Sequence, residues 1–395
     1  MMETLITVQR ALELIRANVH TLTPAHRPLS EATGLVLAED LYAGLNIPAF
    51  PQSGMDGYAF TFSTGTTSYE IEGEVAAGDA IAFTLAPGKA SRIFTGAAVP
   101  PGADTVLPQE KARIIDGRLE FDEGGIRQGD NVRPTGSEIS MGTLALASGA
   151  VLHPARIGFL SGMGIAAALV VPSPTVSIIV TGNELQQAGN PLGYGQVYDS
   201  NSPMLNACLE NMGIRDVHIY FSGDVPDRLN ELLQEALERS DLVLMTGGVS
   251  VGDYDFTLGA FDACGVTRHF HKIRQKPGKP LLFGTRGHRA VFGLPGNPAS
   301  VLTCFYEYVL PALSIMTGDR KEMITRKAVL AHAHKKPAGL THFLKARVDE
   351  DSVSLKGGQE SYKLSSYAEA NCIAVLPEEA TDFEAGQFIE IHIIP

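Results

Sequence analysis

Cysteine is scarce in this sequence, and no cysteine has another close by. The 395 residues contain only Cys208, Cys264, Cys304 and Cys372, and none of these forms a Cys-x-x-Cys pair. This spacing argues against a structural zinc site. We therefore expect buried free thiols in a protein of a reducing compartment.

Long apolar runs and an excess of basic residues are missing as well. No apolar run reaches 18 residues, and the N-terminal residues lack the apolar core of a signal peptide. Apolar residues between Val8 and Val19 recur at helical spacing instead. The formal net charge of -13 argues against nucleic-acid or anionic-membrane binding, but it leaves room for an anionic ligand in a locally basic pocket. We expect a cytoplasmic protein with no nucleic-acid or membrane partner.

The glycine-rich stretch TGGVSVGDYD, Thr246 to Asp255, also lacks the common nucleotide and calcium motifs. It contains neither G-x-x-x-x-G-K-[ST] nor G-x-G-x-x-G, and Leu258 occupies the position where an EF-hand loop needs glycine. A phosphate-binding loop, a metal site and a plain turn all stay open for this stretch alone.

Three regions with different residue patterns follow one another along the chain. Residues from about 42 to 139 are rich in glycine and proline and contain the hairpin signal Asp116-Gly117, which predicts a small mostly-β domain. Residues from about 176 to 318 alternate strand and helix patterns, and residues from about 323 to 395 return to short strands. We expect an α/β plus β fold, with a doubly wound, mostly parallel α/β domain and small β domains.

Polar loops follow the predicted strands TVSIIV, VHIYF, DLVLM, RHFHKI and RAVF of the α/β region. Ligands bind beyond the carboxyl ends of the strands of such sheets, so these loops are expected to share one edge. The residues that they place there are Glu184, Asp224, Asp253, Asp255, Lys276, Lys279, Pro295, Asn297 and Pro298. Each loop alone is typical of a turn or a helix cap, whereas their joint occurrence indicates a site.

The chemistry of these loops is coherent. Carboxylates hold a hard cation such as Mg²⁺, glycine N–H groups at helix N-termini bind anions, and lysines offset phosphate or oxyanion charge. The predicted β domain adds Asp56 in PQSGMDGYA, Thr95 before Gly96, and Glu138 in GDNVRPTGSE. Taken singly, these are typical turn residues.

Taken together, the motifs occur in a known order. SGMDGYA, TGAAVPPGADTVLPQE, GDNVRPTGSE, TGNEL, GGVSVGDYD, KPGKP and GLPGNP resemble the molybdopterin molybdotransferase family, which includes MoeA and the E domain of gephyrin. The resemblance implies insertion of molybdate into adenylylated molybdopterin with release of AMP, in molybdenum cofactor biosynthesis. It also implies a Mg²⁺-dependent homodimer of elongated, four-domain subunits.

The resemblance further implies domain boundaries. These are an adenylyltransferase-like α/β substrate-binding domain of residues 1–22 plus 173–322, a connecting domain of residues 23–41 plus 140–172, a mostly-β domain of residues 42–139 and a C-terminal β domain of residues 323–395.

The site residues are implied in the same way. The catalytic positions are Asp56, Thr95, Glu184, Asp224, Asp255, Lys272 and Lys276, of which Glu184, Asp224 and Asp255 are the metal ligands. The substrate-binding positions are Gly247, Gly248, Ser250, Lys279, Pro295, Asn297, Pro298, Glu138 and Ser366. The chain departs from the family pattern at Asn183, where many members have Asp, at Glu138, where Asp is common, and at Tyr362-Lys363, where a smaller residue is expected.

The expected partners are adenylylated molybdopterin and molybdate as substrates, a second copy of the chain, the molybdopterin adenylyltransferase and acceptor molybdoenzymes. Two other functions stay open: a molybdopterin adenylyltransferase, which the α/β domain alone would suggest, and a molybdopterin-binding dimeric scaffold.

Overall fold

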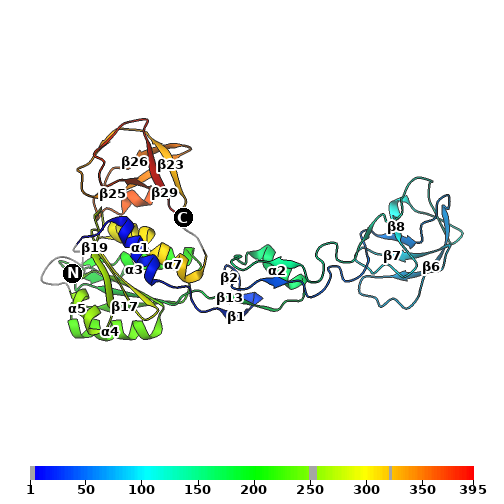
Figure 1. Ribbon diagram of the computed structural model, residues 1–395, viewed down its shortest axis with the longest axis horizontal. Helices are drawn as coiled ribbons and strands as arrows, with labels where there is room; N and C mark the ends of the chain where they lie inside the picture. The colour runs from blue at the N-terminus through cyan, green and yellow to red at the C-terminus, as the bar shows by residue number, and fades with distance from the viewer. Residues whose placement is uncertain (1–4, 249–255, 320–322) are drawn as a thin grey trace. The chain divides into compact units, whose positions relative to one another are not determined.

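The computed structural model describes residues 5–248, 256–319 and 323–395. The chain folds into two compact units (Figure 1). The first unit comprises Met1–His26, Gly34–Val36 and Leu169–Pro395, and the second comprises Arg27–Thr33 and Leu37–Ala168. The fold is α/β plus β in several domains, which confirms the predicted fold class. The predicted boundaries of four domains stay a prediction.

The first unit is built around a mixed sheet of order β17-β14-β18-β22-β21-β19. Its strands are β14 (Val176–Thr181), β17 (Val217–Ser222), β18 (Leu242–Thr246), β19 (Thr267–Lys272), β21 (Pro280–Arg286) and β22 (Arg289–Leu294). β17, β14, β18 and β22 are mutually parallel, whereas β21 is antiparallel to both β22 and β19. β19 therefore points the same way as β22.

All strands predicted for this region form, but β21 is an additional strand that was not predicted. Strands β21 and β22 make a hairpin, with Gly287 at a φ of 60° in the turn between them. The sheet is therefore mixed at this side, although the direction of β19 still brings its carboxyl end to the same edge as those of β14, β17, β18 and β22.

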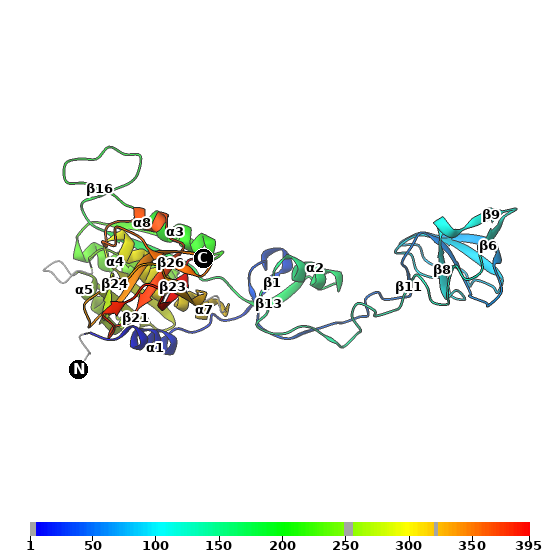
Figure 2. The ribbon, with the colours of Figure 1, turned by 90° about the horizontal axis from the view of Figure 1, so that it is seen from above.

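Helices pack on both faces of this sheet (Figures 1 and 2). They are α1 (Val8–Asn18), α3 (Asn201–Asn211), α4 (Pro226–Arg239), α5 (Phe256–Ala263), α6 (Pro298–Cys304) and α7 (Leu310–Thr317). Because successive strand residues face opposite sides, Ile178 packs with α1, α3, α6 and α7, whereas Ile179 packs with α4 and α5. The cysteines are free and buried, as predicted.

A long apolar helical run lies within this core. Residues Pro298–Thr317 pass through α6, the π-helix η3 (Phe305–Val309) and α7, and the run is long and apolar enough to cross a membrane. Most of its side chains are buried in the first unit. Burial in the protein therefore accounts for its composition.

A second sheet of the first unit has the order β20-β25-β26-β23-β29-β27, and β25 also pairs with β27. The strands are β20 (Gln275–Lys276), β23 (Thr325–Leu330), β25 (Thr341–Asp349), β26 (Ser352–Leu355), β27 (Cys372–Leu376) and β29 (Phe388–Ile393), and α8 (Ser365–Ala368) lies between β26 and β27 in the chain. Strand β20 comes from the α/β region and runs parallel to β25. The segment that carries Lys276 is thus held by the C-terminal sheet.

The second unit contains a sheet of order β8-β5-β7-β6-β10-β9 and the helix α2 (Pro154–Gly162). Its strands are β5 (Gly57–Phe60), β6 (Ser68–Val75), β7 (Lys89–Ile93), β8 (Thr105–Pro108), β9 (Arg113–Ile115) and β10 (Arg118–Glu120). The predicted hairpin at Asp116-Gly117 joins β9 to β10, and both turn residues have positive φ values, 48° and 75°.

The other elements are short. They are β1 (Ala25–Pro28), η1 (Leu29–Glu31), β2 (Val36–Leu37), β3 (Leu41–Tyr42), β4 (Gln52–Ser53), η2 (Gln109–Lys111), β11 (Val132–Arg133), β12 (Leu144–Leu146), β13 (Ala167–Val171), β15 (Leu185–Gln186), β16 (Val197–Tyr198), β24 (His334–Lys335) and β28 (Asp382–Phe383). Figure 2 shows the segment around β16 as a loop that extends from the first unit.

The close contact between Gly57 and the neighbouring strand β8 can be tested by mutation. A Cβ atom at Gly57 would lie 1.8 Å from the carbonyl oxygen of Leu107 on the neighbouring strand β8. We expect Gly57→Ala to lower the free energy of unfolding of this unit by about 3 kcal/mol, because the strands must separate to admit a methyl group. Gly44→Ala is the control, since no atom lies within 4 Å of its Cβ position. Equal urea unfolding midpoints for the two variants would contradict this account.

A buried ion pair predicts a pH-dependent stability for the first unit. His392 Nδ1 lies 3.0 Å from both carboxylate oxygens of Glu307, and both side chains are largely buried. Burial alone would lower the pKa of His392, but the hydrogen bonds and charges of Glu307 and, to a smaller extent, Glu390 outweigh it and raise that pKa above 6.5.

The stabilisation by protonated His392 is therefore complete below about pH 6.5 and is lost as the pH rises through the raised pKa. The difference in unfolding free energy between the wild type and His392→Gln should shrink over that range in urea titrations. The exposed His332 provides the control variant His332→Gln. A difference for His392→Gln that does not change with pH would refute the assignment.

Candidate functional site

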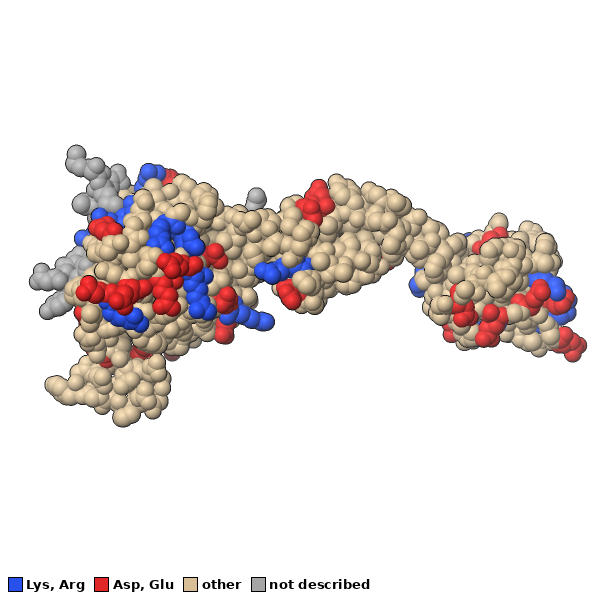
Figure 3. Space-filling view, turned by 90° about the horizontal axis from the view of Figure 1, so that it is seen from below, with Lys and Arg blue, Asp and Glu red and all other residues tan. Residues whose placement is uncertain are grey.

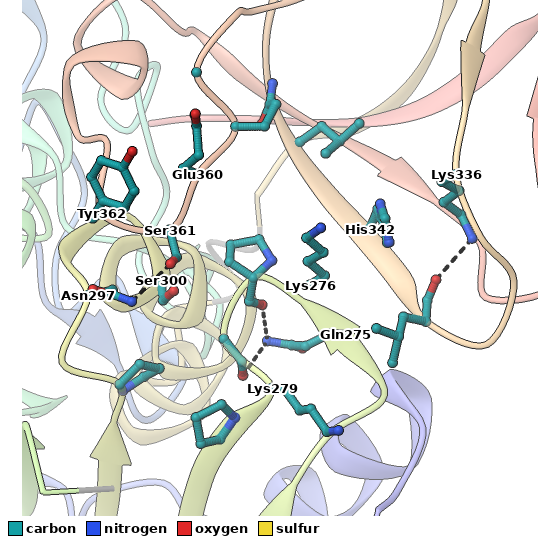
Figure 4. A pocket seen from close by; sticks show the side chains of 18 of the residues that line it. Gln275, Lys276, Lys279, Asn297, Ser300, Lys336, His342, Glu360, Ser361 and Tyr362 are labelled. Atoms are coloured by element: carbon teal, nitrogen blue, oxygen red, sulfur yellow. Dashed lines mark hydrogen bonds between the residues drawn. The ribbon is translucent and has the colours of Figure 1, made fainter. Parts of the chain in front are cut away.

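A cleft of about 970 Å³ lies in the first unit between loops of the α/β sheet and the C-terminal sheet (Figure 4). Its walls come from segments that are far apart in the chain. The lining residues are Gln275 to Pro280, Pro295 to Asn297, Ser300, His334 to Pro337, Leu340, His342, Leu344 and Gly358 to Tyr362. The predicted substrate residues Lys276, Lys279, Pro295 and Asn297 are thus brought together here.

The KPGK turn is held from beneath by the buried side chain of Gln275. Its Nε2 donates hydrogen bonds to the carbonyl oxygens of Pro277 at 3.1 Å and Gly278 at 3.0 Å, and Tyr308 Oη donates to its Oε1. The carbonyl groups of Pro277 and Gly278 are thus bound to the interior side chain of Gln275, which fixes the turn. The exposed side chains of Lys276 and Lys279 extend from it.

Asn297 and Pro298 begin α6 on the opposite wall. Pro298 takes the first helical position, where its missing N–H costs nothing. Asn297 does not cap the helix with its side chain; its Nδ2 donates to Ser361 Oγ at 2.9 Å. Asn201 Nδ2 donates to the carbonyl of Gly296 at 2.9 Å. The start of α6 is therefore fixed to the C-terminal part of the chain.

The C-terminal wall of the cleft is basic. His342 is buried, and burial together with the charges of Lys336, Lys276 and His334 lowers its pKa to about 4. The ammonium of Lys336 is also buried and donates to the carbonyl of Leu340 at 3.0 Å, while its burial lowers its pKa. Within the described part of the chain, His342 Nε2 has no hydrogen-bond partner. An anionic ligand would complement this wall electrostatically.

The strand-end carboxylates lie at the sheet edge, outside the lining of this cleft. Glu184 follows β14 and Asp224 follows β17, a neighbouring parallel strand. Asn183 N–H donates to Asp224 Oδ2 at 3.3 Å, and Asp224 N–H donates to Asn183 Oδ1 at 3.2 Å. The backbone N–H of residue 183 thus binds the Asp224 carboxylate, and the side chain of Asn183, the departure from the family pattern, binds the Asp224 backbone.

The glycines after β18 leave the backbone at this edge of the sheet free of side chains. Gly247 and Gly248 have φ values of 85° and 64°, and a Cβ at Gly247 would lie 2.5 Å from the carbonyl oxygen of Thr181. A Cβ at Gly296 would lie 4.0 Å from Gly247 Cα, so this glycine pair adjoins a loop of the cleft. Ser250, Asp253 and Asp255 lie outside the described residues.

The predicted metal ligands cannot all be placed, because one of them is Asp255. Across residues 5–248, 256–319 and 323–395, no three His, Cys, Asp or Glu side chains gather as metal ligands would. Glu184 and Asp224 nevertheless supply carboxylate oxygens, the donors that Mg²⁺ prefers. The metal site stays a prediction.

Three other predicted residues lie apart from the cleft lining. Lys272 ends β19, where its carbonyl accepts from Ile6 N–H at 3.1 Å. Ser366 is buried behind the cleft wall and donates from Oγ to the carbonyl of Gly358 at 2.7 Å. Glu138 is an exposed residue of the second unit.

In the second unit, Asp56 is hydrogen-bonded to Thr95. Asp56 Oδ1 accepts from both the N–H and the Oγ1 of Thr95, each at 2.7 Å. The backbone hydrogen bond is the main cause that lowers the pKa of Asp56. Arg92, which was not among the predicted site residues, donates to the carbonyl of Gly57 at 3.2 Å and lies 5.1 Å from the centre of the Tyr58 ring. Asp56 is thus an oriented carboxylate.

The basic residues His334, Lys335, Lys336 and His342 of the C-terminal wall were not predicted either. The prediction drew on loops that follow strands of the α/β region, whereas these residues come from the C-terminal domain. The basic run HAHKKP, residues 332–337, could have indicated them, since three of its basic residues line the cleft just before Pro337.

Comparison with known protein families matches most of the chain. Residues 6–164 match the MoeA N-terminal region (domain I and II), residues 177–314 match a probable molybdopterin binding domain, and residues 327–394 match the MoeA C-terminal region (domain IV).

Individual relatives agree with these matches. The molybdopterin molybdenumtransferase of Haemophilus influenzae is 32% identical over 377 residues, which cover 92% of each chain. The molybdopterin molybdenumtransferase 2 of Mycobacterium tuberculosis is 32% identical over 404 residues and 98% of each chain. The crystal structure of a molybdopterin biosynthesis MoeA protein from Pyrococcus horikoshii superposes with a TM-score of 0.81 at 28% identity, covering 98% of this chain and 99% of that one. The resemblance predicted from the motifs is thereby confirmed: the chain belongs to the molybdopterin molybdenumtransferase (MoeA) family.

Proposed function

We propose that this protein is a molybdopterin molybdotransferase, which inserts molybdate into adenylylated molybdopterin and releases AMP in molybdenum cofactor biosynthesis. Family membership over the whole chain supports this function, since relatives that cover it end to end are named molybdopterin molybdenumtransferases. Both proposed substrates are anions, so the enzyme needs a basic pocket of nucleotide size.

The observation that carries the proposal is the gathering of cations around the cleft. Lys276 and Lys279 extend from the α/β region. On the C-terminal side, the ammonium of Lys336 is buried and donates to backbone carbonyls, and Lys335 is paired with Asp382 Oδ1 at 2.9 Å. Lys276 and Lys279 are therefore the lysines that we propose to meet the ligand. The volume of about 970 Å³ is at the upper end of ordinary ligand pockets. Elsewhere charges are mixed: on the face drawn in Figure 3, acidic and basic side chains lie among one another. Lys276 and Lys279 therefore act locally, as point charges for phosphate or oxyanion groups.

The glycine loop and the carboxylates complete the proposed site. Gly247 and Gly248 leave their backbone free of side chains, so an anion can approach their N–H groups. Glu184, Asp224 and Asp255 would hold Mg²⁺, which when bound supplies positive charge that stabilises the phosphate during cleavage of the phosphoanhydride. The backbone N–H of Asn183 holds the Asp224 carboxylate for this role.

Asp56 and Thr95 are proposed to act at the molybdate-inserting step. The two donors of Thr95 are both used by Asp56, so Thr95 orients the carboxylate in this conformation rather than binding an oxyanion with those donors. Asp56 is ionised at neutral pH, and the hydrogen bonds from Thr95 lower its pKa further. A homodimer in which the β domain of a partner subunit completes the site belongs to the same proposal, as does a cytoplasmic location.

A single assay separates the proposed function from its rivals. Purified protein is mixed with adenylylated molybdopterin, molybdate and Mg²⁺, and AMP is measured by chromatography. Molybdate-dependent AMP release supports the proposal. Consumption of ATP with molybdopterin would favour the adenylyltransferase, and pterin binding without turnover would favour the scaffold.

The metal site is tested by Asp255→Ala. We expect a loss of AMP release of about 100-fold or more, because a bound metal stabilises transition-state charge by several kcal/mol. Chelation of Mg²⁺ should reduce the wild type similarly and leave the variant unchanged. The control is Asp262→Ala, which removes an exposed carboxylate from α5. Wild-type turnover by Asp255→Ala would exclude it as a ligand.

The shared site is tested by complementation. Asp56→Ala and Lys276→Ala should each abolish AMP release as pure homodimers. Co-expressed with separate affinity tags and purified as mixed dimers, they should regain activity, because every mixed dimer then contains one site with both residues intact. Inactive mixed dimers would show that each site is built within one chain, and a monomer in light scattering would rule out the homodimer.

A further inference from the structure

Lys345 is a lysine in the interior of the C-terminal sheet, with only 2% of its surface exposed. It lies on β25, and its ammonium donates to the carbonyl oxygens of Gly358 at 2.7 Å, Lys363 at 3.0 Å and Glu360 at 3.2 Å. Its Nζ also lies 5.7 Å from the centre of the Tyr367 ring. These three carbonyls form a backbone cage around one positive charge.

The cage compensates the cost of burying that charge. Burial lowers the pKa of Lys345, and an ammonium without acceptors would be strongly disfavoured in this position. An ammonium has three N–H donors, and here each has a carbonyl acceptor. Ser366 Oγ donates to two of the same oxygens, those of Gly358 and Lys363. The predicted residue Ser366 thus belongs to the cage rather than to the cleft surface.

The caged segment Gly358–Lys363 forms one wall of the cleft. Gly358 through Tyr362 line it, and Ser361 connects the segment to the start of α6. The carbonyl of Ser361 accepts from Ala299 N–H at 3.1 Å, and its Oγ accepts from Asn297 Nδ2 at 2.9 Å. The side chain of Gln359 also ties this segment to the backbone of Lys345. Losing the central charge would therefore loosen, rather than detach, a wall of the cleft and its contact with the Asn297 loop.

We infer that Lys345 is a positioning residue whose ammonium serves as a built-in monovalent cation, holding the Gly358–Lys363 wall of the cleft in place for substrate. Its effect on turnover rests on the proposed function, whereas its cation cage is testable by itself. A shortened side chain at this position leaves an empty cage of carbonyl oxygens, which suits a small monovalent cation such as ammonium.

The test compares Lys345→Ala with Lys345→Met, in ammonium chloride or in choline chloride at equal ionic strength. Alanine empties the cage, whereas methionine fills it with an uncharged chain of similar length. We expect both variants to lose about 100-fold in kcat/KM for AMP release, as displacement of a positioning wall by about 1 Å can cause. Ammonium, but not choline, should restore much of this loss and raise the unfolding midpoint for Lys345→Ala only.

The control Lys327→Ala removes an exposed lysine from the same sheet and should behave as the wild type in both salts. Wild-type turnover by Lys345→Met would overturn the inference, even if Lys345→Ala does not fold. A loss in Lys345→Ala without any ammonium effect on either readout would overturn it too. If the wild type itself releases no AMP, the proposed function fails, and the unfolding midpoints in the two salts still decide whether the cage binds a cation.

Discussion

Five strands of the α/β sheet run in one direction, and the position of the cleft follows from this shared direction. β14, β17, β18 and β22 are parallel, and β19 returns to the same direction because β21 intervenes antiparallel to both neighbours. Their carboxyl ends therefore meet at one edge of the sheet, where side chains no longer pack into the layers and the polar loops are free to face a ligand. The buried faces of the same strands hold this edge rigid from both sides.

Two buried polar side chains hold the loops that form the walls of the cleft at that edge. Gln275 binds the carbonyls of the KPGK turn, and Lys345 binds those of the Gly358–Lys363 segment. Each binds backbone carbonyls of its loop from the interior, and the outward side chains of that loop are left available. Lys276, Lys279 and the Asn297 loop then line the same cleft.

The two units carry functional groups of different chemical character. The first unit gathers ammonium groups and glycine backbone, which suit anions, and the second unit offers the ionised Asp56 held by Thr95. The pKa values of single residues follow this division: burial and neighbouring cations lower the pKa of His342 to about 4, whereas hydrogen bonds from Thr95 lower the pKa of Asp56. A protein with an acidic net charge can therefore still hold an anionic substrate, because the relevant field is local.

Local patterns in the sequence were enough to predict the fold class, the family and the loops after the strands, since apolar periodicity, turn residues and motifs each lie in single stretches. They also predicted Lys276, Lys279, Pro295 and Asn297, which line one cleft. The unpredicted strand β21 is a local feature, since it pairs with β22 in a hairpin. Only the tertiary structure decides that Ser366 lies behind a wall and that His342 and Lys336 of the C-terminal region line the same cleft as Lys276. Those relations depend on pairing between segments distant in the chain, such as β20 with β25, and no local pattern encodes such pairing.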